Sequence, residues 1–165
     1  GGPHVSREKV EARLRELGIV YQISEHAAVF TIEELDLLSF DGQGEVCKNL
    51  FLRDAKGTRH FLVVLQKDKR ADLKRLRGIL GTTALSFASE ERLARYLALT
   101  KGAVTPLAVV NDPERAVEVL IDEDLAGCPC LGVHPGVNTA TVWLSCGDLV
   151  RYIEADGRPV RFIKI

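Results

Sequence analysis

Several stretches of the chain repeat apolar residues every three or four positions, the spacing that gathers them on one face of a helix. In "SREKVEARLREL", Val10, Leu14 and Leu17 share a face, and Ser6 is suited to cap the start. A capping box, Thr31 with Glu34, marks another helix start. With similar caps or terminal glycines elsewhere, we predict helices over residues 6–17, 31–38, 72–80, 89–99 and 145–155.

Other apolar stretches are short and separated by turn residues, which is typical of strands. The clearest are "CKNLFLRD" and "TRHFLVVLQ", which flank the turn "DAKGT" and predict a hairpin. Most predicted strands come in such pairs, so we expect a single mixed α/β domain with a curved, mixed or antiparallel sheet surrounded by helices. The remaining strands are predicted over residues 19–24, 106–112, 116–122, 131–136, 139–145 and 158–165.

The composition is that of one globular domain and agrees with the predicted fold class. The chain has 165 residues, of which 46% are hydrophobic and 27% are charged. No apolar run approaches the roughly 18 residues of a membrane span, and no secretory signal is recognisable. The opening residues 1–4 look like a remnant of cloning, so we assign the domain to residues 5–165. We expect a cytoplasmic protein with no membrane partner.

Charge and cysteine usage leave two questions open. Residues 53–77 contain nine Lys or Arg and three Asp, although the formal net charge is only −1. This stretch is either an ordinary solvated face or a surface that holds phosphates. The four cysteines include one close pair, Cys128 and Cys130, and the four histidines are scattered, so the spacing of a zinc site is missing. We expect free thiols, no bound metal and no cofactor.

Lys48 stands among apolar residues at the start of the predicted hairpin. A half-buried ammonium group requires an anion or several acceptors to offset its desolvation, and a ligand phosphate or carboxylate would serve. The alternative is that the aliphatic stem packs while the amine reaches water. Its neighbour Cys47 is a candidate reactive thiol, but alternation in a strand points the two side chains to opposite faces.

Two further loops are candidates for chemistry. Gly102 to Pro106 form a G-x-x-x-P segment that can present backbone amides and carbonyls to a reacting group, or can be a plain connection. His134, followed by Pro135 and Gly136, is predicted at a strand end, where it can bind a ligand, transfer a proton or remain a core histidine. No serine or cysteine stands in a recognisable nucleophile setting.

Five segments in colinear order resemble the YbaK/ProX superfamily of aminoacyl-tRNA deacylases, in particular its free-standing ProX (PrdX-like) branch. They are "EHAAVFTIEEL", "CKNLFLRD", "DLKRLRGILGTTALSFASEERL", "GAVTPLAVVND" and "HPGVNTATV", which together cover nearly the whole chain. The resemblance implies a curved sheet that binds the 3′ end of tRNA in a cleft. The implied activity is metal-independent hydrolysis of alanine wrongly attached to proline tRNA.

The resemblance also implies roles for individual residues. The family's lysine corresponds to Lys48 and would hold the terminal adenosine or its phosphate. The backbone of the G-x-x-x-P loop, including Gly102, would fix the aminoacyl ester and a water, and His134 would line the amino-acid pocket. The remaining expected substrate-binding residues are Phe30, Asn49, Ala103, Thr105, Pro106, Gly136 and Asn138.

Because an aminoacyl ester is already activated, such a site requires only a positioned water and a stabilised oxyanion, which agrees with the missing nucleophile. A pocket that admits alanine and excludes the larger proline would supply specificity. Ala103 stands where serine is more usual in the family. Gly136 stands where a bulkier residue is common, which implies a roomier pocket and leaves serine, threonine or another small residue open as the amino acid removed. Cys128 and Cys130 match no family motif.

The expected partner is the acceptor end of mischarged tRNA(Pro). Prolyl-tRNA synthetase is a second expectation, either as a partner or as a parent chain. The alternative function is a non-catalytic module that binds tRNA ends or nucleotides through the basic stretch 53–77.

Overall fold

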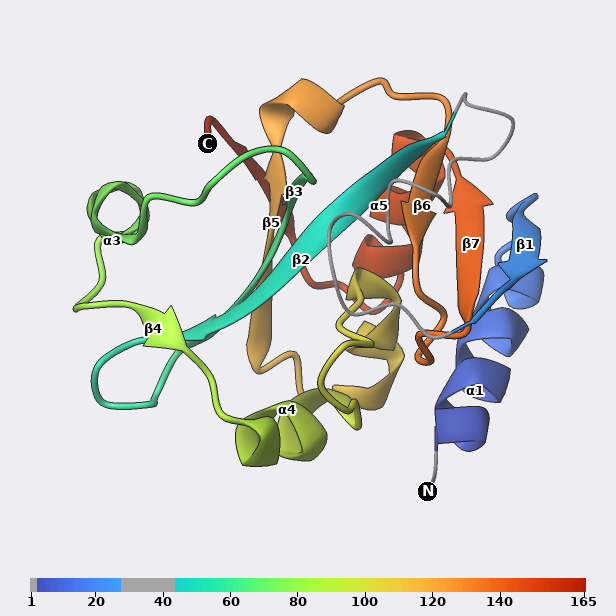
Figure 1. Cartoon of the computed structure of the whole chain (residues 1–165). Coiled ribbons are helices and arrows are strands. Elements are labelled where there is room, and N and C mark those ends of the chain that lie inside the picture. The colour runs from blue at the N-terminus through green and yellow to red at the C-terminus, as the bar shows by residue number, and fades with distance from the viewer. Residues whose placement is uncertain (1–2, 28–43) are drawn as a thin grey trace.

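The computed structural model of the chain describes residues 3–27 and 44–165. Strands in this part of the chain form one mixed sheet, shown in Figure 1. They are β1 (Gln22–Glu25), β2 (Glu45–Arg53), β3 (His60–Gln66), β4 (Ser86–Phe87), β5 (Val117–Asp122), β6 (Leu131–Val133), β7 (Ala140–Leu144) and β8 (Val160–Ile163). The strand order is β1-β7-β6-β2-β3-β5-β8, and β4 also pairs with β2.

The described helices confirm four of the five predicted ones. They are α1 (Pro3–Glu16), α3 (Leu73–Leu80), α4 (Glu90–Leu97) and α5 (Cys146–Glu154), with short 3-10 helices η2 (Pro106–Asn111) and η3 (Glu123–Leu125). Ser89 and Ser145 cap α4 and α5 as predicted. Helix α1 begins at Pro3 and not at Ser6. The predicted helix over residues 31–38 and the candidate residue Phe30 lie outside the described residues.

The sheet combines both pairing modes, so the expected mixed α/β class is confirmed. The β2–β3 hairpin is antiparallel, with Phe51 opposite Leu62. Strands β6 and β7 are also antiparallel, as are β1 and β7. In contrast, β2 pairs with β6, β3 with β5, and β5 with β8 in parallel. These parallel pairs join segments that are distant in sequence, which no hairpin pattern predicts.

Two apolar cores occupy the two faces of β2 and β3. The larger contains Cys47 and Phe51 of β2 together with side chains from α1, α4, η2 and α5. The smaller contains Leu52 of β2 and is covered by Leu76 and Leu80 of α3. This division follows the two-residue period of a strand, which sends alternate side chains of β2 to opposite faces.

The prediction of a strand over residues 106–112 is wrong, because the segment forms the 3-10 helix η2. Pro106 occupies the first helical position, where its missing N–H is not required. Thr105 caps the helix, since its Oγ1 accepts a hydrogen bond from the Leu107 amide at 3.2 Å. The apolar run is short enough to be either a strand or a buried helical turn, and the Thr-Pro pair was the signal that favoured the helix.

Candidate active site

The site expected from the sequence surrounds the part of β2 where that strand loses one of its neighbours. Strand β2 registers with β6 only at Glu45↔Leu131 and Val46↔Gly132, and with β4 only at Leu52↔Phe87 and Arg53↔Ser86. Among the described strands, residues 47–50 of β2 therefore pair on one side only, with β3, and the Phe51 carbonyl already accepts a hydrogen bond from the Ala88 amide at 2.9 Å. Figure 1 shows β2 running diagonally away from β6.

His134 lies at the β6 end of this stretch of β2, in a defined tautomer. Its Nδ1 is 2.9 Å from the Ala140 carbonyl oxygen, and because a carbonyl only accepts, Nδ1 carries the proton. Nε2 therefore presents a lone pair. Burial lowers the pKa of His134, the Ala140 hydrogen bond opposes this, and the neighbouring His26 lowers it further. The imidazole is thus neutral at pH 7 and can accept a hydrogen bond or a proton.

Asn49 lies on the same stretch of β2 and carries an unsatisfied acceptor. Its Oδ1 is buried and has no hydrogen-bond partner among the described residues. A buried acceptor without a partner costs roughly 1–3 kcal/mol, so such a group is unusual unless a ligand or water completes it. Asn49 and His134 line a common cavity of about 10 Å³, together with Val46, Cys47, Gly132, Val133 and Thr141.

Lys48 emerges on the same sheet face as His134. Val46 and Gly132 are registered in parallel, and Lys48 and His134 each follow that pair by two residues, which returns both to one face. The Lys48 side chain is half-buried, and its Nζ donates a hydrogen bond to the Lys69 carbonyl oxygen at 2.6 Å. The amine therefore lies beside the turn after β3, on the other flank of β2 from His134.

The G-x-x-x-P loop approaches β2 from the opposite face. Gly102 has φ +90°, a backbone conformation that favours glycine. Ala103, Thr105 and Pro106 are buried, and the following residues of η2 pack in the larger core with Phe51. The structure thus brings His134 and Lys48 to the face of β2 that lies away from the G-x-x-x-P loop, whereas Asn49, two residues before Phe51, lies by alternation on the face toward the loop.

Gly136 and Asn138 lie in the turn between β6 and β7. Gly136 is buried with φ +98°, which a larger residue would adopt only under strain. The backbone conformation alone therefore accounts for glycine here. Asn138 is partly exposed in the same turn.

The four cysteines are free, and the structure gives them no activated setting. Burial raises the pKa values of Cys47, Cys130 and Cys146, which keeps these thiols protonated at neutral pH. Cys128 donates through Sγ to the Cys130 carbonyl oxygen at 3.5 Å. Within residues 3–27 and 44–165, no group of three or more His, Cys, Asp or Glu residues could hold a metal ion.

The sequence of this chain matches that of a known protein family. Residues 26–152 match the family described as the aminoacyl-tRNA editing domain. The chain belongs to this family. None of the helices in the described part of this editing domain is both long and apolar enough to cross a bilayer.

Relatives of this editing domain span nearly its whole length. It is 48% identical over 160 residues to "Prolyl-tRNA editing protein ProX" of Acetoanaerobium sticklandii, covering 97% of this chain and 98% of the relative. It is 38% identical over 150 residues to "Prolyl-tRNA synthetase associated domain-containing protein 1" of Danio rerio, covering 90% and 81%. A solved structure of a candidate trans-editing enzyme for prolyl tRNA synthetase shares the fold, with TM-score 0.74, 24% identity and 97% of both chains covered.

One neighbour of the editing-domain site was missed by sequence reasoning. His26 follows β1, and its ring lies 6.3 Å from that of His134 between centroids. Its Nδ1 contacts the Ala27 carbonyl at 2.7 Å, and its Nε2 lies 2.8 Å from Thr141 Oγ1. Since Nδ1 must donate to the carbonyl, Nε2 accepts from the Thr141 hydroxyl. His26 and Thr141 lie 115 residues apart, so only the β1–β7 pairing reveals their contact.

Proposed function

We propose that this chain is a trans-editing hydrolase that removes alanine from mischarged tRNA(Pro). The observation that carries the proposal is the 48% identity, over nearly the full length of both chains, to a protein named for prolyl-tRNA editing. The acceptor Nε2 of His134 supports it, as does Asn49 Oδ1, which has no partner in the described part of the chain, because both can orient a water or a substrate amine.

In the proposed reaction, a water oxygen attacks the carbonyl carbon of the aminoacyl ester. The carbon–oxygen bond to the terminal ribose breaks, which yields free alanine and a tRNA with an unmodified 3′ end. One water proton passes to the departing ribose oxygen, helped by the adjacent ribose hydroxyl. No covalent enzyme intermediate is required, in agreement with the raised pKa of the Cys47 thiol on β2.

We assign Lys48 the task of binding the terminal adenosine or its phosphate. Its amine would exchange the Lys69 carbonyl for the RNA anion, a charge-assisted and therefore stronger hydrogen bond. Backbone groups of the loop from Gly102 to Pro106 would fix the ester and the attacking water. His134 would line the amino-acid pocket, and bulk would exclude proline from it.

A deacylation panel tests the proposal. The protein is incubated with alanyl-, seryl-, threonyl- and prolyl-tRNA(Pro), and loss of each ester is followed. We expect rapid loss of the alanyl ester and retention of the prolyl ester. Lys48→Ala should abolish turnover, whereas the matched control Lys56→Ala, on the exposed hairpin turn, should leave it unchanged. Full activity of Lys48→Ala would disprove the assigned site.

The second candidate is a non-catalytic module that grips tRNA ends through the basic stretch 53–77. Two of the nine basic residues in this stretch are engaged in ion pairs, Arg59 with Glu118 and Lys69 with Asp122 and Asp124, and are less available to phosphates. Tight tRNA binding with every ester intact would favour the module over the hydrolase. Association with prolyl-tRNA synthetase is a separate proposal, which co-migration of the two proteins in gel filtration would test.

A further inference from the structure

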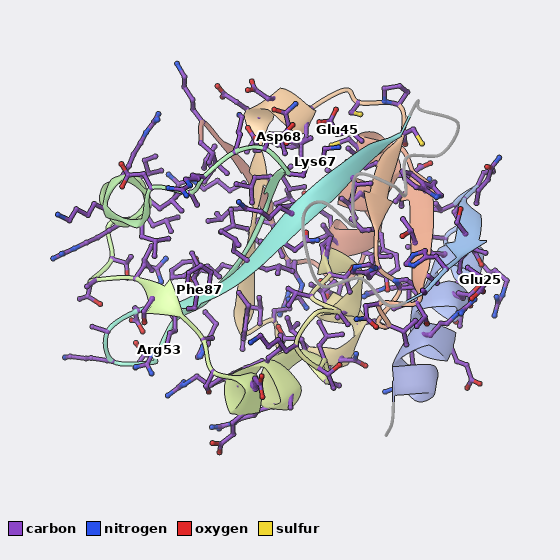
Figure 2. All side chains as sticks on the ribbon, in the orientation of Figure 1. Glu25, Glu45, Arg53, Lys67, Asp68 and Phe87 are labelled. Carbon is purple, nitrogen blue, oxygen red and sulfur yellow. The ribbon has the colours of Figure 1, made fainter. Side chains whose placement is uncertain are left out.

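Phe87 is an aromatic side chain that the fold leaves in solvent beside the candidate active site. It lies on β4 and is 64% exposed, although the other phenylalanines of the hairpin region, Phe51 and Phe61, are buried. Figure 2 shows Phe87 beside Arg53, at the opposite end of β2 from Glu45. A ring exposed in this way offers apolar surface that a ligand can bury, so what lies around Phe87 decides whether it can bind one.

Phe87 forms one wall of a groove that runs to the G-x-x-x-P loop. The groove has a volume of about 390 Å³, within the usual range for small-molecule sites. Phe51 and Leu93 line it from β2 and α4, and Val104 lines it from the loop. Its polar residues include Lys101 on the loop side and Glu90 on the α4 side.

The groove lies where β4 joins β2, and the cavity between Asn49 and His134 lies farther along the same strand, where no described strand pairs with that edge of β2. Leu52, which pairs with Phe87, follows Asn49 by three residues, or about 10 Å along a strand. A single-stranded chain that reaches the ester site at one end of this edge can therefore place a preceding base over the groove. The ammonium group of Lys101 can pair with the phosphate of that preceding nucleotide. The carboxylate of Glu90 repels the same phosphate from the α4 side.

We propose that this groove is a stacking subsite for a nucleotide that precedes the esterified one in the single-stranded 3′ end of RNA. The base stacks on Phe87 between Val104 and Phe51, and the adjoining phosphate pairs with Lys101. Aromatic platforms combined with cations are the general means of holding single-stranded nucleic acid without reading its sequence. The inference rests on the proposed function for the identity of the RNA, but it concerns binding and not hydrolysis.

The binding test uses the full chain and a fluorescein-labelled RNA hexamer ending in CCA-3′, followed by fluorescence anisotropy. Stacking on an aromatic side chain is typically strong enough that Phe87→Ala should weaken binding about 5- to 150-fold. Phe87→Trp should bind at least as tightly as the unaltered protein. The matched control is Phe162→Ala, an exposed phenylalanine on β8, which should bind normally. Lys101→Ala should reduce the slope of log affinity against log salt by about 0.7, the value for one phosphate of a single strand.

Three outcomes would overturn the inference: no binding of the hexamer, unchanged binding by Phe87→Ala, or an equal loss in Phe162→Ala. If Phe87→Ala were to unfold, Phe87→Trp and Lys101→Ala would still decide the matter. A second substrate separates this inference from the proposed function. Phe87→Ala should hydrolyse alanyl-adenosine, which has no preceding nucleotide, with unchanged kcat/KM, but should lose kcat/KM on alanyl-tRNA. Binding that depends on Phe87 without any hydrolysis would refute the proposed function and leave the subsite intact.

Discussion

Replacing Arg158 by methionine should destabilise the fold strongly, because this arginine completes a buried charge network. Only 2% of Arg158 is exposed, and its Nη1 donates to Asp112 Oδ2 at 2.8 Å. Its guanidinium also donates to the carbonyl oxygens of Val109, Asp112 and Val117. The network thereby ties the end of η2 to β5.

The expected cost follows from what Arg158→Met leaves behind. Asp112 keeps two backbone N–H donors, from Ala116 and Val117, but loses its counter-charge in a buried position. Removing one member of a buried ion pair typically costs about 3–5 kcal/mol. For a chain of this length, that corresponds to a fall in Tm of about 6–20 °C.

Urea unfolding followed by circular dichroism measures this loss, with Arg115→Met as the control. Arg115 is exposed, and its hydrogen bond to the Asp156 carbonyl oxygen is long at 3.5 Å, so its loss should change stability by less than about 0.5 kcal/mol. The double variant Asp112→Ala, Arg158→Met should recover part of the lost stability, because the uncompensated charge is removed. Arg158→Met unfolding within about 1 kcal/mol of the unaltered protein would refute the reasoning.

Two further predictions concern the site and its supporting strands. Burial lowers the pKa of His134, so activity that depends on its neutral Nε2 should persist at pH 6.5 and fall only at more acidic pH. A pH–rate profile that falls already above pH 7 would contradict this expectation. The same shift means that the unfolded chain binds the proton more tightly, so stability should decline as pH falls below about 6.5, and less so in His134→Gln. Gly132→Ala would place a Cβ 2.6 Å from the Trp143 ring and should cost about 1–3 kcal/mol in urea unfolding, whereas Gly78→Ala, with open space on α3, should be neutral or stabilising. Equal stability of these two glycine variants would contradict the close contact.

Local patterns predicted the elements of this fold better than their arrangement. The cap at Ser89, the turn at residues 54–58 and the strand over residues 116–122 depend on neighbouring residues, and the structure contains all three. Parallel pairing of β3 with β5 joins residues more than fifty positions apart, and nothing in either segment specifies it. Sequence alone therefore indicated a mixed sheet but not its strand order.

Contacts between residues distant in sequence also limited the prediction of the candidate site. Lys48 was noticed because a charge stood in an apolar run, which left its burial open, and in the structure its side chain is half-buried. His26 gave no such signal, since its partner Thr141 is a residue of a distant strand. Phe87 was also missed, because a phenylalanine in a sequence is read as core unless its exposure is known.

The divergence of β2 from β6 explains why His134, Asn49 and Phe87 all lie along one edge of β2. A strand edge without a neighbour leaves backbone groups and alternate side chains open to a ligand, which most sheets avoid by pairing or covering the edge. Here His134 at the end of β6 and Phe87 on β4 lie at the two ends of this edge, and Asn49 lies between them with an acceptor that no described residue satisfies. If a nucleic-acid end occupies this edge, its ester and its preceding base contact opposite ends of that edge. Variants at His134 should then alter turnover of alanyl-adenosine and of alanyl-tRNA alike, whereas variants at Phe87 should alter only the latter.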